Sequence, residues 1–317
     1  MSAKTTEKLV AYVRLSKVSA YQHFYLWILV SMVLWCEGHL DSSENRIALA
    51  CFIVASIFSV ASSAAADDVV GFRDGSDAAN YSGEYLSRDV RTKPLLLGML
   101  TESQAVTFAT TAWFLGLMTG FVGIGTLGWR VPVAGIILFV AVQMILVQYN
   151  WGVRISARPL GCEAVMFVGQ VSATLLPYWA ITGRVTALVV YLTLLQGIWL
   201  MTIPAVSNAG DVDGDRAAGR NTTAVVAGPE GVRAELLSVW VVSAGLLVML
   251  CREAGFRWSM VLVFLPLLAV QGLLLWSGVV QQNWAVARKA GFASYGVGTV
   301  TLLVFVLGYS FGWGWAA

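Results

Sequence analysis

The sequence predicts an all-α, polytopic membrane protein, and three observations support this fold class. Of its 317 residues, 58% are hydrophobic and only 12% are charged, about half the roughly 25% of charged residues in a typical soluble domain. The mean hydropathy is +0.74. The 13 Trp and 31 Gly residues also fit membrane helices, where both types are enriched. This composition excludes an ordinary soluble enzyme, a disordered chain and a disulfide-rich scaffold.

Apolar runs of about 20 residues, the length that crosses a bilayer, divide the chain into candidate spans. We expect nine transmembrane helices in a single domain over residues 1–317. The expected helices are residues 19–37, 46–66, 104–126, 131–150, 162–181, 185–207, 234–251, 258–280 and 292–315.

The basic residues support this number of spans and give an orientation. If segment 1–18 and every second connection lie on one side, that side carries 15 of the 20 Lys and Arg residues and the other side five. Cytoplasmic loops are enriched in Lys and Arg, so we expect a cytoplasmic N-terminus, a C-terminus outside and a cytoplasmic polar cap. No organelle signal is evident, which favours the plasma membrane of a prokaryotic cell.

Acidic residues gather on the same side. Of the 18 in the chain, seven lie between Asp67 and Glu102 and five between Asp211 and Glu235. These segments overlap the predicted cytoplasmic loops 67–103 and 208–233. Ionisable residues at the membrane edge are functional candidates, and acidic clusters on a side where positive charge is expected indicate bound divalent cations.

The second acidic cluster follows the sixth expected helix. If that helix continues through it, Asn208, Asp211 and Asp215 share one helical face. Asp213 points away from this face and is expected to be solvated or to cap a helix. Carboxylates so placed can hold Mg²⁺, which takes one or two carboxylates together with substrate phosphate oxygens. The following bases suit bidentate binding of phosphate; they are Arg216 and Arg220. A solvated polar loop explains this cluster, taken alone, equally well.

The first acidic cluster follows the second expected helix. Asp67 and Asp74 are seven residues apart and share a helical face, and Asp77 lies one turn further on. Gly71 and Gly75 weaken a continuous helix here. Two such clusters, each at the end of a span on the same side, favour a diphosphate site with two metal ions.

These segments resemble the motifs of the UbiA superfamily of intramembrane prenyltransferases. Residues 208–222 are similar to the family's Asp-x-x-Asp-x-x-Gly-Asp-Arg motif, with Asn208 in place of its first Asp. Residues 93–98 resemble the family's Arg-Pro-Leu-x-Ser-Gly segment, and residues 149–161 its Tyr-Ser-x-Pro-Pro-x-x-Leu-Lys segment. The first acidic motif departs from the family pattern, because Gly71 and Gly75 occupy two of its acidic positions.

The resemblance implies a Mg²⁺-dependent enzyme that ionises an isoprenyl diphosphate and transfers the prenyl group to an aromatic or other small acceptor. It implies a helical bundle around a central cavity that opens to lipid, and two Mg²⁺ ions bridged by the diphosphate. The implied metal ligands are Asp67, Asp68, Asp74, Asp77, Asp211 and Asp215. The implied catalytic residues are Asp67, Asp68, Asp211, Asp215 and Tyr149. The implied diphosphate-binding residues are Lys93, Arg154, Arg158, Asn208, Arg216 and Arg220. Two further basic candidates precede the first span, Arg14 and Lys17.

Two alternatives remain open. A terpene cyclase of the same superfamily would use a double bond of the substrate itself as the acceptor. A transporter would use the acids as a cation path, but they lie at span ends rather than at the membrane midplane, where coupling sites usually lie. The expected partners are a prenyl diphosphate, the lipid bilayer and a small acceptor. The net charge of +2 indicates no nucleic-acid partner, and no obligate protein partner is evident.

Overall fold

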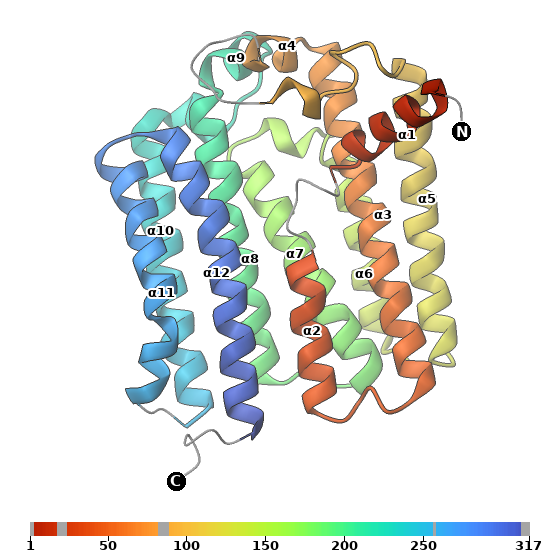
Figure 1. Ribbon diagram of the computed structural model, residues 1–317, viewed down its shortest axis with the longest axis vertical. Coiled ribbons are helices and arrows are strands. Elements are labelled where there is room, and N and C mark those ends of the chain that lie inside the picture. The colour runs from red at the N-terminus through yellow and green to blue at the C-terminus, as the bar shows by residue number, and fades with distance from the viewer. Residues whose placement is uncertain (1–2, 18–23, 82–88, 256–257, 312–317) are drawn as a thin grey trace.

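The computed structural model describes residues 3–17, 24–81, 89–255 and 258–311, and every regular element within them is helical. The apolar helices run up and down in alternation, and the described part of the chain begins at one end of the bundle and finishes at the other (Figure 1). These helices are α2 (Phe24–Cys36), α3 (Ser43–Arg73), α5 (Glu102–Thr126), α6 (Val133–Gln148), α7 (Gly161–Thr182), α8 (Ala187–Gly210), α10 (Thr223–Glu253), α11 (Trp258–Leu275) and α12 (Trp284–Phe311).

Short helices gather at one end of the bundle, which we call the polar end (Figure 1). They are α1 (Ala3–Leu15), α4 (Ser76–Tyr81), η1 (Val90–Thr92), η2 (Ile155–Ala157) and α9 (Val212–Ala217). A π-helical turn, η3 (Trp276–Val280), extends α11 toward the same end. Both acidic clusters of the sequence therefore lie at the polar end, as expected.

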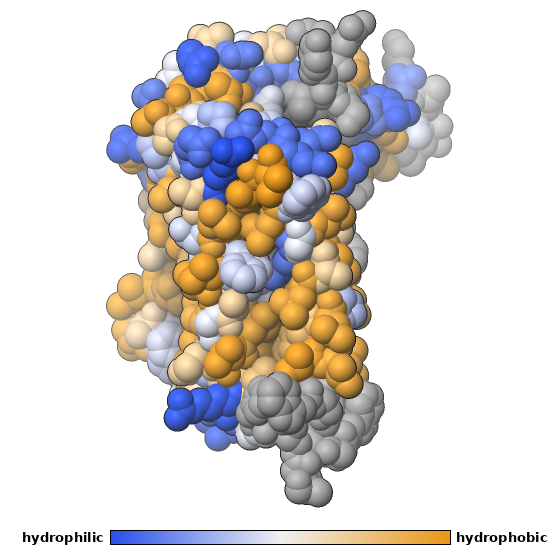
Figure 2. All heavy atoms as spheres, turned by 90° about the vertical axis from the view of Figure 1, so that its left-hand side faces the viewer, coloured by the Kyte–Doolittle hydropathy of each residue, from blue (hydrophilic) through white to orange (hydrophobic). Residues whose placement is uncertain are grey.

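The predicted all-helical membrane protein is confirmed. Seven of the described helices are long and apolar enough to cross a membrane. Two further apolar helices, α2 and α6, are shorter: the 16 residues of α6 span only about 24 Å at a rise of 1.5 Å per residue. Figure 2 shows the side formed by α10 and α11 as an apolar band between hydrophilic ends, which suits a lipid surround. The count of nine spans and their orientation stay predictions.

Two helix boundaries differ from the expected ones. The helix expected to end at residue 66 continues to Arg73, because its last turns are buried and their Asp68 carboxylate is neutralised by lysines. The helix expected to begin at residue 234 starts earlier than that. It runs without interruption after Gly228, whose φ of +63° is not helical. Pro229 follows it, and proline is well suited to the first turn of a helix.

Helix α8 is the most buried of the candidate spans and packs against α7, α10 and α12. Its Trp199 is fully buried, and the indole Nε1 donates a hydrogen bond to Ser243 Oγ of α10 at 2.7 Å. The other face of the indole fills the space above Gly298 of α12, where a Cβ atom would overlap the ring. This contact fixes the spacing of three helices below the polar end.

We expect Gly298→Val to destabilise the bundle by about 1–3 kcal/mol, the usual effect of overpacking a core. The matched control is Gly245→Val, at an exposed glycine of α10 that has open space around its Cβ position. The apparent melting temperature in detergent should fall for Gly298→Val and stay unchanged for Gly245→Val. Equal melting temperatures would contradict the packing described.

Candidate active site

A polar cavity lies at the polar end, lined mainly by α3, α7, α8 and α12, with about 930 Å³ of empty space, counting the part open to solvent. Acids and bases meet in its wall. The polar and titratable side chains that line it include Lys17, Asp67, Tyr81, Lys93, Tyr149, Cys162, Asn208, Asp211, Arg288 and Tyr295. Five of the residues implied by the resemblance are thus brought to one space, and Lys17, a minor candidate from sequence, joins them.

The extension of α3 orients its two adjacent aspartates differently. Asp67 and Asp68 point about 100° apart around the helix. Asp67 faces the polar cavity, with 34% of its side chain exposed, whereas the side chain of Asp68 is 1% exposed. The two residues therefore have different surroundings, although they are adjacent in the sequence motif.

The ammonium of Lys93 lies among the acids of the first cluster. Its Nζ is 2.7 Å from Asp68 Oδ1, 2.7 Å from Asp77 Oδ1 and 4.0 Å from Asp67 Oδ2. Burial alone would lower the pKa of Lys93, but Asp68 and Asp77 hold it well above its usual value. Burial raises the pKa of Asp77 to about 6, against the opposing effect of Lys93. Lys93 is therefore a firmly charged cation.

Asp68 also binds the lysine that follows α1. Lys17 Nζ donates to Asp68 Oδ2 at 3.0 Å and to the carbonyl oxygen of Thr92 at 2.6 Å. Burial and the nearby charge of Lys93 lower the pKa of Lys17, and Asp68 opposes this effect. These contacts tie the N-terminal segment to the end of α3 and to η1.

A second ion-pair cluster surrounds Asp74, the C-cap of α3. Asp74 Oδ2 is 2.7 Å from Arg154 and 3.4 Å from Arg220, and Arg220 is also 3.9 Å from Asp215. Burial would raise the pKa of Asp74, but the hydrogen bond from Ser76 and the charges of Arg220 and Arg154 lower it. Asp74 therefore joins the loops after α6 and α9, and both arginines face it.

In the second motif the helix does not continue unbroken, although the shared face predicted for Asn208, Asp211 and Asp215 assumed that it would. Helix α8 ends at Gly210, and Asp211 adopts a non-helical conformation before α9 begins. Asp211 lines the polar cavity and Asp215 is buried. Asp213 is fully exposed beside Arg216, which agrees with the expectation that it is solvated.

Asn208 contacts Glu163, an acid that the sequence did not indicate as a site residue. It lines the polar cavity, and its Nδ2 donates to Glu163 Oε1 of α7 at 3.0 Å. Glu163 carries a weak signal in the sequence, as an acid in the first turn of a helix that begins at the polar end. Arg158 lies exposed on the loop before α7, away from these contacts.

A glycine brings the two motifs together. Helix α4 packs on α9 (Figure 1), and a Cβ atom at Gly214 would overlap the side-chain amide of Asn80. Gly71 plays a similar part within the first motif, because a Cβ there would lie 2.6 Å from Cγ of Asp77. Close backbone approach thus explains both glycines.

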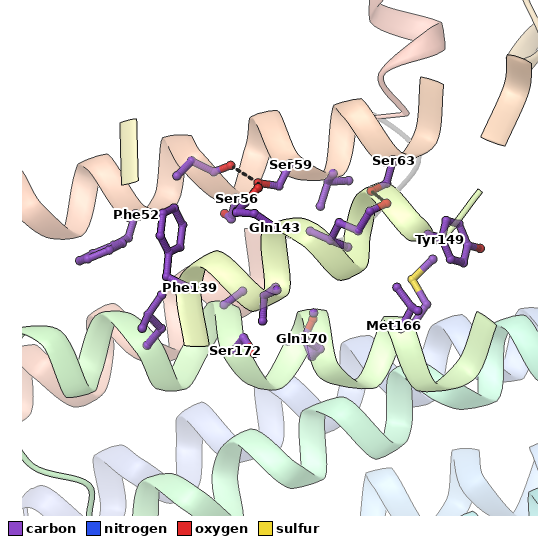
Figure 3. A pocket seen from close by; sticks show the side chains of 18 of the residues that line it. Phe52, Ser56, Ser59, Ser63, Phe139, Gln143, Tyr149, Met166, Gln170 and Ser172 are labelled. Atoms are coloured by element: carbon purple, nitrogen blue, oxygen red, sulfur yellow. Dashed lines mark hydrogen bonds between the residues drawn. The ribbon is translucent and has the colours of Figure 1, made fainter. Parts of the chain in front are cut away.

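An apolar chamber adjoins the polar cavity between α3, α6 and α7, with about 1130 Å³ of empty space, counting the part open to the surroundings. The two spaces share part of their lining, namely Asp67, Tyr149, Met166 and Leu200. Figure 3 shows Tyr149 and Met166 at one end of the chamber and Phe52 and Phe139 at the other, with the Ser59–Gln143 pair between α3 and α6. The chamber was not predicted from the sequence in this detail.

Tyr149 lies where the polar cavity meets the apolar chamber. Its hydroxyl is 2.9 Å from Cys162 Sγ at the start of α7, which fixes the ring at the junction. Tyr149 is thus well placed to contact the part of a ligand that joins a charged head to an apolar tail.

The donor set of the cavity fits a metal bound together with a diphosphate. In the described parts of the chain, no three Asp, Glu, His or Cys side chains converge on a metal site of their own. Asp67 and Asp211 nevertheless open on one cavity from opposite segments. Mg²⁺ is commonly held by one or two carboxylates plus substrate phosphates, which is the arrangement that these two residues allow.

Comparisons with known proteins agree with this architecture. The model of the UbiA prenyltransferase family matches residues 24–296. A UbiA homolog from Archaeoglobus fulgidus bound to DMAPP and Mg²⁺ has a TM-score of 0.64 at 15% identity, covering 94% of this chain and 98% of the other. Its complex with GPP and Mg²⁺ gives 0.63 at 15%, covering 94% and 99%.

A third similar structure is that of a digeranylgeranylglyceryl phosphate synthase, with a TM-score of 0.64, 16% identity and coverage of 96% and 99%. A comparison with curated proteins finds no match. At these identities the solved structures show the shared fold.

The contact between Gly214 and Asn80 gives a test of how the motifs are joined. We expect Gly214→Ala to lower the melting temperature, since overpacking typically costs about 1–3 kcal/mol. Adding Asn80→Ala, which removes the amide that the new methyl meets, should restore most of the loss. Additive effects of the two substitutions on the melting temperature would show that α4 and α9 do not meet there.

Proposed function

The chain belongs to the UbiA prenyltransferase family, and on this premise we propose that it is a Mg²⁺-dependent intramembrane prenyltransferase. It would ionise an isoprenyl diphosphate and transfer the prenyl group to an aromatic or other small acceptor. The observation that carries this proposal is the adjacency of two spaces: a cavity lined by Asp67, Asp211 and bases shares part of its wall with an apolar chamber. The pair matches a molecule with an anionic head and a hydrocarbon tail.

The head of the substrate would bind in the polar cavity. Asp67 and Asp211 would hold Mg²⁺, which when bound neutralises the leaving diphosphate. Lys17, Lys93 and Arg288 also line this space, and cations fixed before the reaction stabilise the charge that develops on the diphosphate. The DMAPP and GPP complexes of the A. fulgidus homolog support this class of ligand.

The hydrocarbon tail would lie in the apolar chamber. Tyr149 lines both spaces, so the carbon that loses the diphosphate would lie near its ring, and an aromatic face stabilises a cation by about 0.5–2 kcal/mol. The chamber walls, mostly apolar, keep water from the cation. The hydrogen bond between Tyr149 and Cys162 holds the phenol in place during this step.

The chamber's aromatic residues also support a second candidate function, terpene cyclisation. Trp27, Phe52 and Phe139 line it and would stabilise a cation displaced along a folded chain. Purified protein with Mg²⁺ and geranyl diphosphate separates the two functions. Diphosphate release that depends on an added acceptor supports transfer, and a cyclic product without acceptor supports cyclisation.

The polar end would face the cytoplasm of a prokaryotic cell. This orientation rests on the excess of Lys and Arg in the connections at that end.

We expect Asp67→Asn and Asp211→Asn each to lower kcat/KM for a prenyl diphosphate by about 100-fold or more, the range for losing one electrostatic stabiliser in an active site. Asp213→Asn is the matched control, because this carboxylate belongs to the same motif and is fully exposed. Its turnover should match that of the wild type. Retained turnover in both Asp67→Asn and Asp211→Asn, with unchanged melting temperature, would refute the site.

Gly169 offers a test of the chamber. It lies on α7 in the chamber wall, and a Cβ atom there would be 4.0 Å from its nearest neighbour, so a larger side chain can enter the empty space. We expect Gly169→Phe to lower kcat/KM for geranyl diphosphate by about 10-fold or more and to affect dimethylallyl diphosphate less.

The control for this substitution is Gly245→Phe, at an exposed position of α10. It makes the same chemical change outside the chamber and should leave the ratio of the two substrates unaltered. An unaltered ratio in Gly169→Phe as well would mean that the tail lies elsewhere.

A further inference from the structure

The first acidic cluster already contains cations of its own. Lys93 Nζ lies 2.7 Å from carboxylate oxygens of both Asp68 and Asp77, and only 6% of its side chain is exposed. Lys17 Nζ binds the other oxygen of Asp68 at 3.0 Å. The ammonium of a lysine has three donors, so Lys93 occupies the centre of this cluster as a tethered ion would.

Glycine replaces acid in the helix for a steric reason. The carboxylate of Asp77 lies against the backbone of Gly71, leaving no room for a side chain there. Gly75, with φ of +78°, makes the left-handed turn that folds α4 back onto α3. The carboxylate beside Gly71 is thus that of Asp77, which comes from α4 rather than from α3, and its ion-pair partner is Lys93.

The bases of the cluster offset two of its three carboxylate charges. Asp67, Asp68 and Asp77 carry three negative charges, and Lys17 and Lys93 carry two positive ones. Of the three acids, Asp67 lines the polar cavity, together with both lysines, while Asp68 and Asp77 are buried against the bases. A metal ion that used Asp68 and Asp77 as ligands would have to displace a buried ammonium bound by two carboxylates.

We propose that Lys93 is the resident cation of the first acidic cluster and takes the place of one of the two Mg²⁺ ions that the family resemblance implies. The protein then binds a single divalent ion with its diphosphate, in the cavity that Asp67 and Asp211 line. Asp68 and Asp77 position Lys93 and hold no metal. This inference rests on the proposed function and deepens it, because it assigns the cations of the same site.

The test is a count of Mn²⁺ ions bound by the purified protein in detergent, with a non-ionising thio analogue of geranyl diphosphate, by equilibrium dialysis and electron paramagnetic resonance. We expect one Mn²⁺ per chain. Two Mn²⁺ per chain in the wild type, with turnover intact, would overturn the inference and leave the proposed function standing. Binding of neither Mn²⁺ nor the analogue would overturn the proposed function, and the inference with it.

Variants make the assignment specific. Asp77→Asn should keep one Mn²⁺ per chain, whereas a two-ion site that uses Asp77 would lose one. Lys93→Ala should gain a second Mn²⁺, because it frees two carboxylates. Arg91→Ala removes an exposed base that pairs with Asp89 and should leave the count at one. If Lys93→Ala does not fold, the wild-type count and Asp77→Asn decide the question.

Discussion

The buried pairing of Lys93 with Asp68 and Asp77 is the contact on which the polar end depends. Charges taken out of water are costly unless they are paired and hydrogen-bonded, and removal of one partner leaves the others uncompensated. This cluster joins the end of α3, the helix α4 and the segment before α5, while Lys17 adds the N-terminal segment. The same constraint places Asp74 between Arg154 and Arg220. Two ion-pair clusters therefore fix loops that the apolar core alone would not order.

These clusters also divide the acids by task. Asp68, Asp74 and Asp77 hold bases in place, and this leaves Asp67 and Asp211 facing the polar cavity. Glycine contacts set the distance between the two halves, since Gly214 lets α9 approach Asn80 of α4. Below them, the apolar chamber lies along α3, α6 and α7 (Figure 3). The site thus consists of a charged cavity beside an apolar chamber. The face of the bundle shown in Figure 2 is apolar between hydrophilic ends.

The sequence predicted the helical membrane fold well, because a span of apolar residues is a local property. It also placed both acidic motifs at one end, because successive connections are alternately rich and poor in Lys and Arg. It could not predict that Asp67 and Asp68 diverge, because their roles depend on lysines 51 and 25 residues from Asp68. Nor could it show that the helix breaks at Asp211, or that Glu163 and Arg288 lie beside the motifs. Such contacts depend on how distant segments pack, and the spacing of residues within one motif does not predict them.

In the proposed function, Asp67 and Asp211, 144 positions apart in the sequence, act on one bound diphosphate. A double-mutant cycle on the affinity for the thio analogue of geranyl diphosphate in Mg²⁺ tests this most directly, using Asp67→Asn, Asp211→Asn and the double variant. Groups that share one ligand are strongly coupled, so we expect a coupling free energy of about 1.4 kcal/mol or more, a tenfold departure from additivity. Strictly additive losses would mean that the two carboxylates serve separate sites, and would contradict the account.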